Sequence, residues 1–154
     1  MRLTTMTDYA MRLLMYVAQR PERLCTISEV AGAYAISEAH LMKITHRLAQ
    51  CGWLETVRGR GGGMRLAAVP AAISLGAVVR SVEPDFDLVD CFAGDTTCLL
   101  TGQCRLTGIV SGALQSFMEH LDRHTLADLL PSAAAGVAQS RPLTFSKRRP
   151  VVAN

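Results

Sequence analysis

The spacing of hydrophobic residues predicts an amphipathic helix near the start of the chain. Between residues 4 and 19, apolar side chains recur every three or four positions and share one face, while Thr5, Asp8, Arg12 and Gln19 fall on the other. Asp8 lies where the positive end of the helix dipole favours a carboxylate, and Arg12 follows at the spacing of an ion pair. The residues themselves therefore favour a structural role for Asp8.

Two shorter helical patterns follow. Thr26-Ile-Ser-Glu29 has the form of a capping box and predicts a helix that runs to about Tyr34. Ser37 is placed to cap a third helix, and Gly52 fits its end. The apolar stripe of this third helix consists of Leu41, Ile44, Leu48 and Cys51. Two short helices joined by a tight turn, after a longer helix, are typical of a helix-turn-helix.

In such a motif the third helix contacts DNA. Its outward face begins with short polar side chains and continues with cations, which suits base edges near the helix start and phosphates beside them. These candidate DNA-binding residues are Ser37, Glu38, His40, Lys43 and Arg47. An ordinary solvated helix surface is the alternative interpretation.

A glycine-rich hairpin is predicted next. Residues 53–57 and 64–67 form two short strand patterns, joined by Arg58-Gly-Arg-Gly-Gly-Gly63. A tip with so little side chain can lay backbone amides and the guanidinium groups of Arg58, Arg60 and Arg65 along a DNA groove or a phosphate ridge. A nucleotide-binding phosphate loop would need a strand-loop-helix context and a Lys-Ser/Thr ending, which this segment lacks. The pattern favours a winged helix-turn-helix.

Hydrophobic periodicity returns after the hairpin. Ser74–Val82 predicts a short connecting helix, and Arg105–His124 predicts a long helix whose apolar positions recur close to a heptad. So broad an apolar face predicts a partner, and the simplest partner is a second copy, because two-fold DNA sites require two-fold proteins. From Ser132 the periodicity ends, and Pro, Ser and basic residues indicate a disordered tail.

Charge is unevenly distributed along the chain. Residues 1–66 hold nine Lys or Arg against five Asp or Glu, residues 67–140 hold three against eight, and residues 141–154 hold four against none. A basic front half followed by an acidic middle predicts a polyanion-binding module joined to a second unit. No stretch approaches a membrane span and the N-terminus lacks an apolar signal core, so we expect a cytoplasmic protein without a membrane segment.

Three of the five cysteines, Cys91, Cys98 and Cys104, are spaced C-x6-C-x5-C. These gaps are too long for the paired knuckles of tetrahedral zinc, whereas an iron–sulfur cluster accepts looser loops, because thiolates need only converge on the corners of a cage. Packing residues, or a disulfide with a spare thiol, are the alternatives. Cys51 is expected to be a small core residue, and Cys25 a loop or core residue.

Together these motifs resemble a known family. The segments T-x-x-x-D-Y-A-x-R-x-L from Thr4 to Leu14 and R-G-R-G-G-G-M-R-L-A from Arg58 to Ala67, with clustered cysteines before a long helix, are similar to the bacterial winged-helix iron–sulfur regulators typified by NsrR and IscR. The resemblance implies a mainly α fold: a winged helix-turn-helix with a small two-stranded wing, a cluster-binding loop and a long dimerisation helix. A homodimer would grip a palindromic promoter, and the cluster would control that grip.

The resemblance also implies how the cluster is held. In NsrR-like members an aspartate near the start of the first helix, supplied by the other subunit, completes a 4Fe-4S cluster, and Asp8 stands at the matching place. IscR-like members have a histidine three residues after the last cysteine, where this chain has Thr107. The implied ligands are Cys91, Cys98, Cys104 and Asp8, with Arg12 holding or releasing the aspartate. The first cysteine gap departs mildly from the family pattern, which leaves a 2Fe-2S cluster as the alternative.

The implied function is a nitric-oxide-sensing transcriptional repressor that releases DNA when its cluster is nitrosylated. An IscR-like regulator of iron–sulfur or redox status is the alternative within the family, and a metal-free thiol sensor is another. We expect no enzyme, because the chain lacks a fourth clustered cysteine, a flavin or nicotinamide motif and a catalytic base constellation. The expected domains are a DNA-binding unit at 1–70, a cluster loop and dimerisation helix at 71–130, and a basic tail at 131–154.

Overall fold

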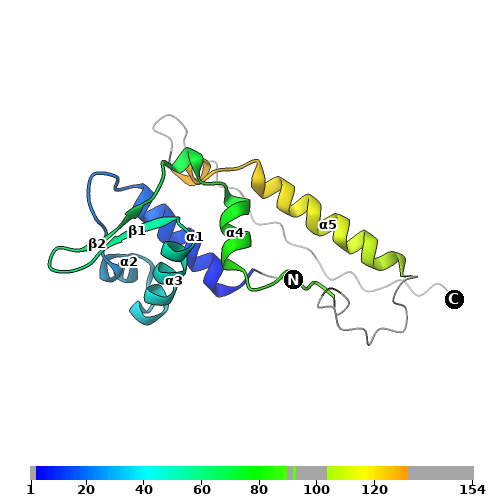
Figure 1. The fold of residues 1–154 in the computed structure, drawn as a ribbon, viewed down its shortest axis with the longest axis horizontal. Helices are drawn as coiled ribbons and strands as arrows, with labels where there is room; N and C mark the ends of the chain where they lie inside the picture. Colours follow the sequence, from blue (N-terminus) through cyan, green and yellow to red (C-terminus); the bar gives the residue numbers. More distant parts are fainter. Residues whose placement is uncertain (1–2, 90–91, 93–103, 132–154) are drawn as a thin grey trace.

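The computed structural model describes residues 3–89, 92 and 104–131 of the chain. The elements are α1 (Thr5–Ala18), α2 (Ile27–Tyr34), α3 (Glu38–Gln50), β1 (Leu54–Val57), β2 (Gly63–Leu66), the 3-10 turn η1 (Pro70–Ala72), α4 (Leu75–Val82), α5 (Arg105–Asp122) and the 3-10 turn η3 (Leu126–Leu129). Helices α1 to α4 and the hairpin form one body, from which α5 extends (Figure 1). The mainly helical fold predicted from the sequence is confirmed.

Side-chain caps fix where the two short helices begin. The Thr26 hydroxyl oxygen accepts from the Glu29 N–H, and the Glu29 carboxylate accepts from the Thr26 N–H at 2.7 Å, which is the predicted capping box. The Ser37 hydroxyl oxygen accepts from the His40 N–H at the start of α3. After α3 the chain turns at Gly52, whose φ of +79° suits glycine. The helix-turn-helix is therefore set by local signals.

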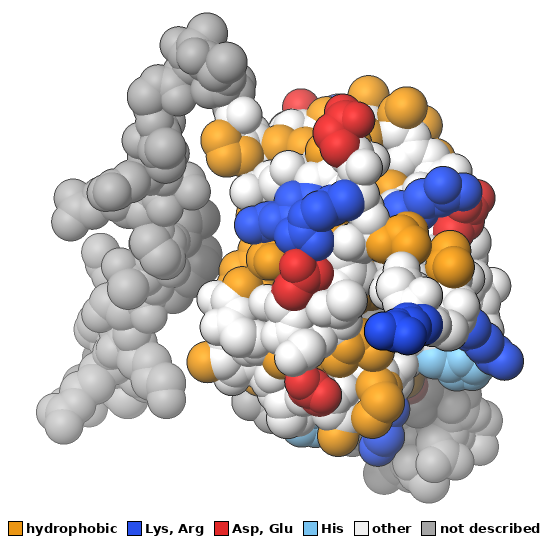
Figure 2. Space-filling model, turned by 90° about the vertical axis from the view of Figure 1, so that its left-hand side faces the viewer, with side chains coloured by type: hydrophobic (Ala, Val, Ile, Leu, Met, Phe, Trp, Pro, Cys, Tyr) orange, Lys and Arg blue, Asp and Glu red, His pale blue; other side chains and the backbone are white. Residues whose placement is uncertain are grey.

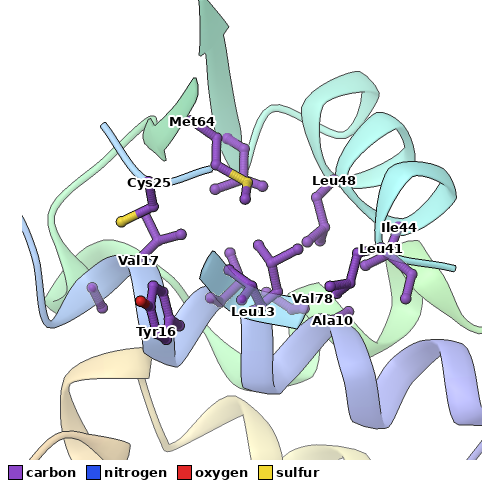
Figure 3. Close-up of a cluster of buried hydrophobic side chains, with 14 of the residues drawn as sticks. Ala10, Leu13, Tyr16, Val17, Cys25, Leu41, Ile44, Leu48, Met64 and Val78 are labelled. Carbon is purple, nitrogen blue, oxygen red and sulfur yellow. The ribbon is translucent and has the colours of Figure 1, made fainter. Parts of the chain in front are cut away.

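The apolar faces of α1, α3 and the hairpin meet in one core (Figure 3). Leu13 of α1 and Leu48 of α3 are 0% exposed, and Met64 of β2 is 1% exposed. Burying a side chain of this size stabilises the fold by about 1.5–3 kcal/mol. Since α2 and α3 are too short to be stable alone, this core holds them in place.

The hairpin is the predicted wing, shifted by one residue from the expected strand bounds. β1 and β2 pair antiparallel, and the Ala67 N–H donates to the Trp53 carbonyl at 3.1 Å just beyond the named strands. Gly61 has a φ of +77°. A Cβ atom at Gly62 would lie 2.3 Å from the Val57 carbonyl oxygen. The turn therefore requires glycine.

Helix α5 crosses α4 through a glycine contact and an ion pair. A Cβ atom at Gly76 would lie 2.0 Å from the Asp122 Oδ1 atom, so the helices approach closely there. Arg80 donates to both carboxylate oxygens of Asp122, at 2.6 and 2.5 Å. The Leu75 N–H donates to the His124 carbonyl at 2.9 Å, and this bond to α4 holds the chain after Asp122 outside the α5 helix. α5 therefore ends two residues before the predicted limit at His124.

Most of α5 stands away from the body (Figure 1). Met118 is buried, whereas Leu106 and Ile109 are 58% and 70% exposed. The apolar face that predicted a partner is thus open along the start of the helix. Within residues 3–89, 92 and 104–131, the helices are all too short or too polar to cross a membrane. The predicted disordered tail from Ser132 lies outside the described residues.

Candidate nucleic-acid interface and metal ligands

The outward face of α3 carries the residues predicted to bind DNA. All five are exposed: Ser37, Glu38, His40, Lys43 and Arg47. The His40 Nδ1 atom lies 3.0 Å from the Ser37 hydroxyl, so these side chains orient each other as well as capping the helix. The Arg47 Nε group donates to the Ser81 carbonyl at 3.0 Å. Arg47 is therefore partly engaged inside the molecule.

The same face also carries exposed residues outside the predicted set. Ala39, Met42 and His46 are exposed beside Lys43, and Met42 is 55% exposed. The prediction considered polar groups and cations, whereas two of these side chains are apolar. Their positions opposite the Leu41-to-Leu48 stripe are the sequence signal that would have found them.

The wing presents the three predicted arginines, Arg58, Arg60 and Arg65, at the surface. Arg65 lies on β2 opposite Glu55 of β1 and forms an ion pair with it at 2.7 Å. Arg58 and Arg60 lie in the turn, where they can approach a phosphate backbone. On this end of the molecule, Lys and Arg side chains lie between hydrophobic ones, with acidic side chains among them (Figure 2).

The end of α3 and the start of the wing are both fastened to α4 at Ser81. The Ser81 carbonyl accepts from Arg47, and it lies 3.7 Å from the Cys51 Sγ atom. The Ser81 hydroxyl oxygen accepts from the Trp53 indole N–H at 2.8 Å. Cys51 is only half-buried, rather than the core residue expected. Because one residue takes these three contacts, α3, the wing and α4 are held together.

Asp8 lies in the first turn of α1 and is paired with Arg12, as the spacing predicts. The Arg12 Nη2 and Asp8 Oδ2 atoms are 2.9 Å apart, and Arg12 Nε donates to Asp8 Oδ1 at 3.2 Å. Both side chains are about half exposed, 46% for Arg12 and 50% for Asp8. A surface pair at this spacing contributes about 0.3–0.5 kcal/mol, so a stronger ligand bond can replace it. The carboxylate is accessible from outside the subunit.

A series of ring contacts leads from Asp8 towards α3. The Arg12 guanidinium carbon lies 6.0 Å from the centre of the Tyr9 ring. The Tyr9 and His40 ring centres are 6.4 Å apart at an angle of 54°. Tyr9 therefore lies between Arg12, which pairs with Asp8, and His40 at the start of α3.

The start of α1 is also bonded to the segment that leads towards the cysteines. The Thr4 N–H donates to Glu83 Oε1 at 2.7 Å, and Glu83 is only 8% exposed. Glu83 follows directly after α4. A buried carboxylate at a helix N-terminus is favoured by the helix dipole. The helix that carries Asp8 and the chain entering the cysteine loop are therefore connected.

Of the three clustered cysteines, Cys104 lies within the described residues, and Cys91 and Cys98 lie outside them. Cys104 precedes the first turn of α5, where the backbone amides of Thr107 and Leu106 lower the pKa of its thiol. A lowered pKa favours the thiolate, which is the form that binds metal.

Cys25 contrasts with Cys104. It is 0% exposed, and burial raises the pKa of its thiol. Cys25 lies in the core, which is one of the two positions that the sequence left open. Among the described residues, no group of three or more His, Cys, Asp or Glu side chains converges in a way that could hold a metal ion.

Comparisons with known proteins identify sequences similar to this chain. Residues 3–132 match the Rrf2 family, described as an iron-dependent transcriptional regulator. The chain is 46% identical over 132 residues to the HTH-type transcriptional regulator NsrR of Halalkalibacterium halodurans, covering 84% of this chain and 90% of that one. It is 45% identical to the NsrR protein of Bacillus subtilis, also over 132 residues, with the same two coverages.

Solved structures show the same fold. The structure of T. potens IscR is similar, with a TM-score of 0.67 and 25% identity, over 84% of this chain and 85% of that one. The structure of CymR, the global cysteine regulator of B. subtilis, has a TM-score of 0.67 and 21% identity, over 84% of this chain and 95% of that one. The winged-helix architecture with a long helix is therefore shared.

Proposed function

Because the chain belongs to the Rrf2 family of transcriptional regulators and is similar to NsrR proteins, we propose that it is a nitric-oxide-sensing repressor. It binds promoter DNA as a homodimer in the cytoplasm and releases it when an iron–sulfur cluster is nitrosylated. The 46% identity to a protein named NsrR, over 84% of this chain, carries the proposal. These relatives are regulators rather than enzymes, as the sequence predicted.

Four residues would hold a 4Fe-4S cluster: Cys91, Cys98 and Cys104 of one subunit and Asp8 of the partner subunit. The amides at the start of α5 support this role for Cys104, because they favour its thiolate. The half-exposed carboxylate of Asp8 supports contact with a second subunit. When bound, the cluster supplies an iron that reacts with nitric oxide.

Asp8 would be the weakest of the four cluster ligands. A carboxylate oxygen is a harder donor than a thiolate and binds iron of a cluster less strongly. Arg12 would hold the carboxylate when it is not bound to iron, because the two already pair at 2.9 Å. Tyr9 and His40 would connect Arg12 to the start of α3. This route would couple cluster binding at Cys91, Cys98 and Cys104 to the position of α3.

Dimerisation would use the open face of α5. Leu106 and Ile109 are 58% and 70% exposed, and burying them against a second copy removes this apolar surface from water. A two-fold dimer can place its α3 helices in successive major grooves, about 34–36 Å apart. Lys43, Arg58 and Arg60 would then neutralise phosphates.

Anaerobic purification followed by titration with nitric oxide tests the proposal. Cluster-loaded protein should be brown and should bind the promoter of its target gene, whereas nitrosylated protein should not. Cys104→Ser should abolish the cluster. Cys51→Ser is the matched control and should retain it, because Cys51 contacts Ser81 instead. Equal promoter binding before and after nitric oxide would contradict the proposed switch.

An IscR-like regulator with a 2Fe-2S cluster is the second candidate, favoured by the structural similarity to T. potens IscR. The presence of Thr107 three residues after Cys104, where IscR-like members have a histidine, weighs against it. Mössbauer spectra of the anaerobically purified protein separate the two cluster types.

A further inference from the structure

The outer face of α3 contains an apolar strip where a DNA-binding helix would meet base edges. Met42 is 55% exposed, whereas Leu41, directly before it, and Ile44, two residues later, are 0% and 3% exposed and face the core. Ala39, three residues earlier, is exposed as well. Residues three apart lie side by side on a helix surface, so Ala39 and Met42 form one continuous apolar strip.

The surroundings of the strip indicate its occupant. Single exposed apolar residues are ordinary on protein surfaces, so exposure alone decides nothing. Here Lys43 lies directly beside Met42, and His46 and Arg47 follow on the next turn, all of them exposed. Glu38, the acidic side chain of the first turn, directly precedes Ala39, whereas Lys43 and Arg47 lie towards the Met42 end. An apolar strip next to these two basic side chains suits a polyanion that also offers an apolar group.

DNA offers such a group in its major groove. Thymine is the base that presents a methyl group there, and small or unbranched apolar side chains recognise it by contact. Methionine is unbranched and adapts to irregular surfaces, and alanine lets the helix backbone approach closely. Both properties are present in this strip.

We infer that Met42 and Ala39 read thymine methyl groups, so that each half of the operator carries thymines at the positions facing the strip. This inference rests on the proposed DNA-binding function and adds to it the base chemistry that α3 selects. It also assigns specificity to two residues outside the set of polar and charged side chains expected from the sequence.

Thymine replacement tests the inference. A random duplex library is first selected with cluster-loaded protein to obtain an operator, and each thymine is then replaced singly by deoxyuridine, which removes the methyl group alone. We expect replacement at one or two positions in each half-site to weaken binding about fivefold, as the loss of one buried methyl contact would. Replacement at the other thymines should leave the affinity unchanged.

A double-mutant cycle then measures whether the thymine methyl group and the Met42 side chain contact each other. In Met42→Ala the deoxyuridine effect should disappear at one of these positions, because the contact is already lost. Lys43→Ala should weaken binding to every duplex and reduce its salt dependence while keeping the effect. Val69→Ala is the control outside α3: Val69 is 68% exposed, and its replacement should leave both the affinity and the effect intact.

The outcomes separate the two proposals. If selection enriches no sequence, the proposed promoter binding fails, and the inference fails with it. If an operator is found and tolerates deoxyuridine at every position, the inference alone is overturned. An unchanged deoxyuridine effect in Met42→Ala would likewise overturn it, because another residue would then contact the methyl group.

Discussion

At the residue scale, adjacent positions of α3 lie in different environments. Leu41 is 0% exposed in the core, and Met42 is 55% exposed on the outer face. The helical period, which turns each residue by about 100° relative to the one before it, produces this separation. Folding and the proposed DNA recognition should therefore respond separately to substitutions at these two neighbouring residues.

We predict that Leu41→Ala lowers the free energy of unfolding by about 2–5 kcal/mol, because it leaves a cavity in the core. Met42→Ala should change it by less than about 0.5 kcal/mol, since surface substitutions are usually nearly neutral. Urea denaturation followed by circular dichroism measures both values. A large loss of stability in Met42→Ala would show that this side chain packs within the fold.

A second residue-scale prediction concerns the thiols of the cluster-free protein. The pKa of Cys104 is lowered by the Thr107 and Leu106 amides, and the pKa of Cys25 is raised by burial. Because the thiolate is the reactive form, alkylation of Cys104 should accelerate at a lower pH than that of a small-molecule thiol. Cys25 should accelerate at a higher pH and react slowly. Mass spectrometry of peptides after brief iodoacetamide treatment across a pH series measures both profiles.

Residue roles were predictable from the sequence only where the partners are close along the chain. The Asp8–Arg12 pair and the Thr26 and Ser37 caps depend on residues three or four positions apart. The contacts of Ser81 with Arg47 and Trp53 join residues 34 and 28 positions apart. No local sequence pattern predicts such contacts. Met42 was left out of the predicted set because that set was chosen for polar and basic side chains, whereas Met42 is apolar and 55% exposed.

At the element scale, the crossing of α4 and α5 decides where the long helix points. The close approach at Gly76 and the Arg80–Asp122 ion pair fix this crossing. The sequence predicted both helices from periodicity, and their bounds agree within two residues because capping signals are local. It could not predict the crossing, or the end of α5 at Asp122, because both depend on contacts between distant segments.

We predict that Gly76→Ala destabilises the protein, because its Cβ atom would lie 2.0 Å from Asp122 Oδ1 and would displace the carboxylate from Arg80. Gly32→Ala in α2 is the matched control, because a Cβ atom there meets nothing within 4 Å. In a helix interior that change should stabilise by about 0.5–1 kcal/mol. Thermal unfolding should show opposite shifts in Tm, and equal shifts would contradict the close crossing.

At the scale of the whole molecule, the winged helix is a complete body, and the start of α5 is not covered by it (Figure 1). The heptad-like spacing predicted an exposed apolar face, and its open placement within the described residues agrees with that expectation. Cys91 and Cys98, predicted as cluster ligands from their spacing and from the resemblance, lie outside the described residues, and their role stays a prediction.

We predict that Ile109→Glu converts the protein to a monomer, because a charge would have to be buried in the proposed interface. Gln115→Lys is the control on the opposite side of α5, where Gln115 bonds Glu119, and it should remain a dimer. Sedimentation velocity measures both. The monomer should bind the two-part operator about 10²-fold or more weakly, because it loses the second linked binding event. A dimeric Ile109→Glu would place the interface elsewhere.

Contacts of Ser81 join α3 and the wing to α4, and the close approach at Gly76 joins α4 to α5. A rotation of α5 would therefore carry the winged helix with it. The 18 residues of α5 give it an arm of about 27 Å. If α5 rotates by roughly 10° about one end, its other end moves by about 5 Å. This displacement exceeds the roughly 3.4 Å step between successive base pairs. In the proposed dimer on DNA, a rotation of this size would move both winged helices out of their grooves without deforming either one.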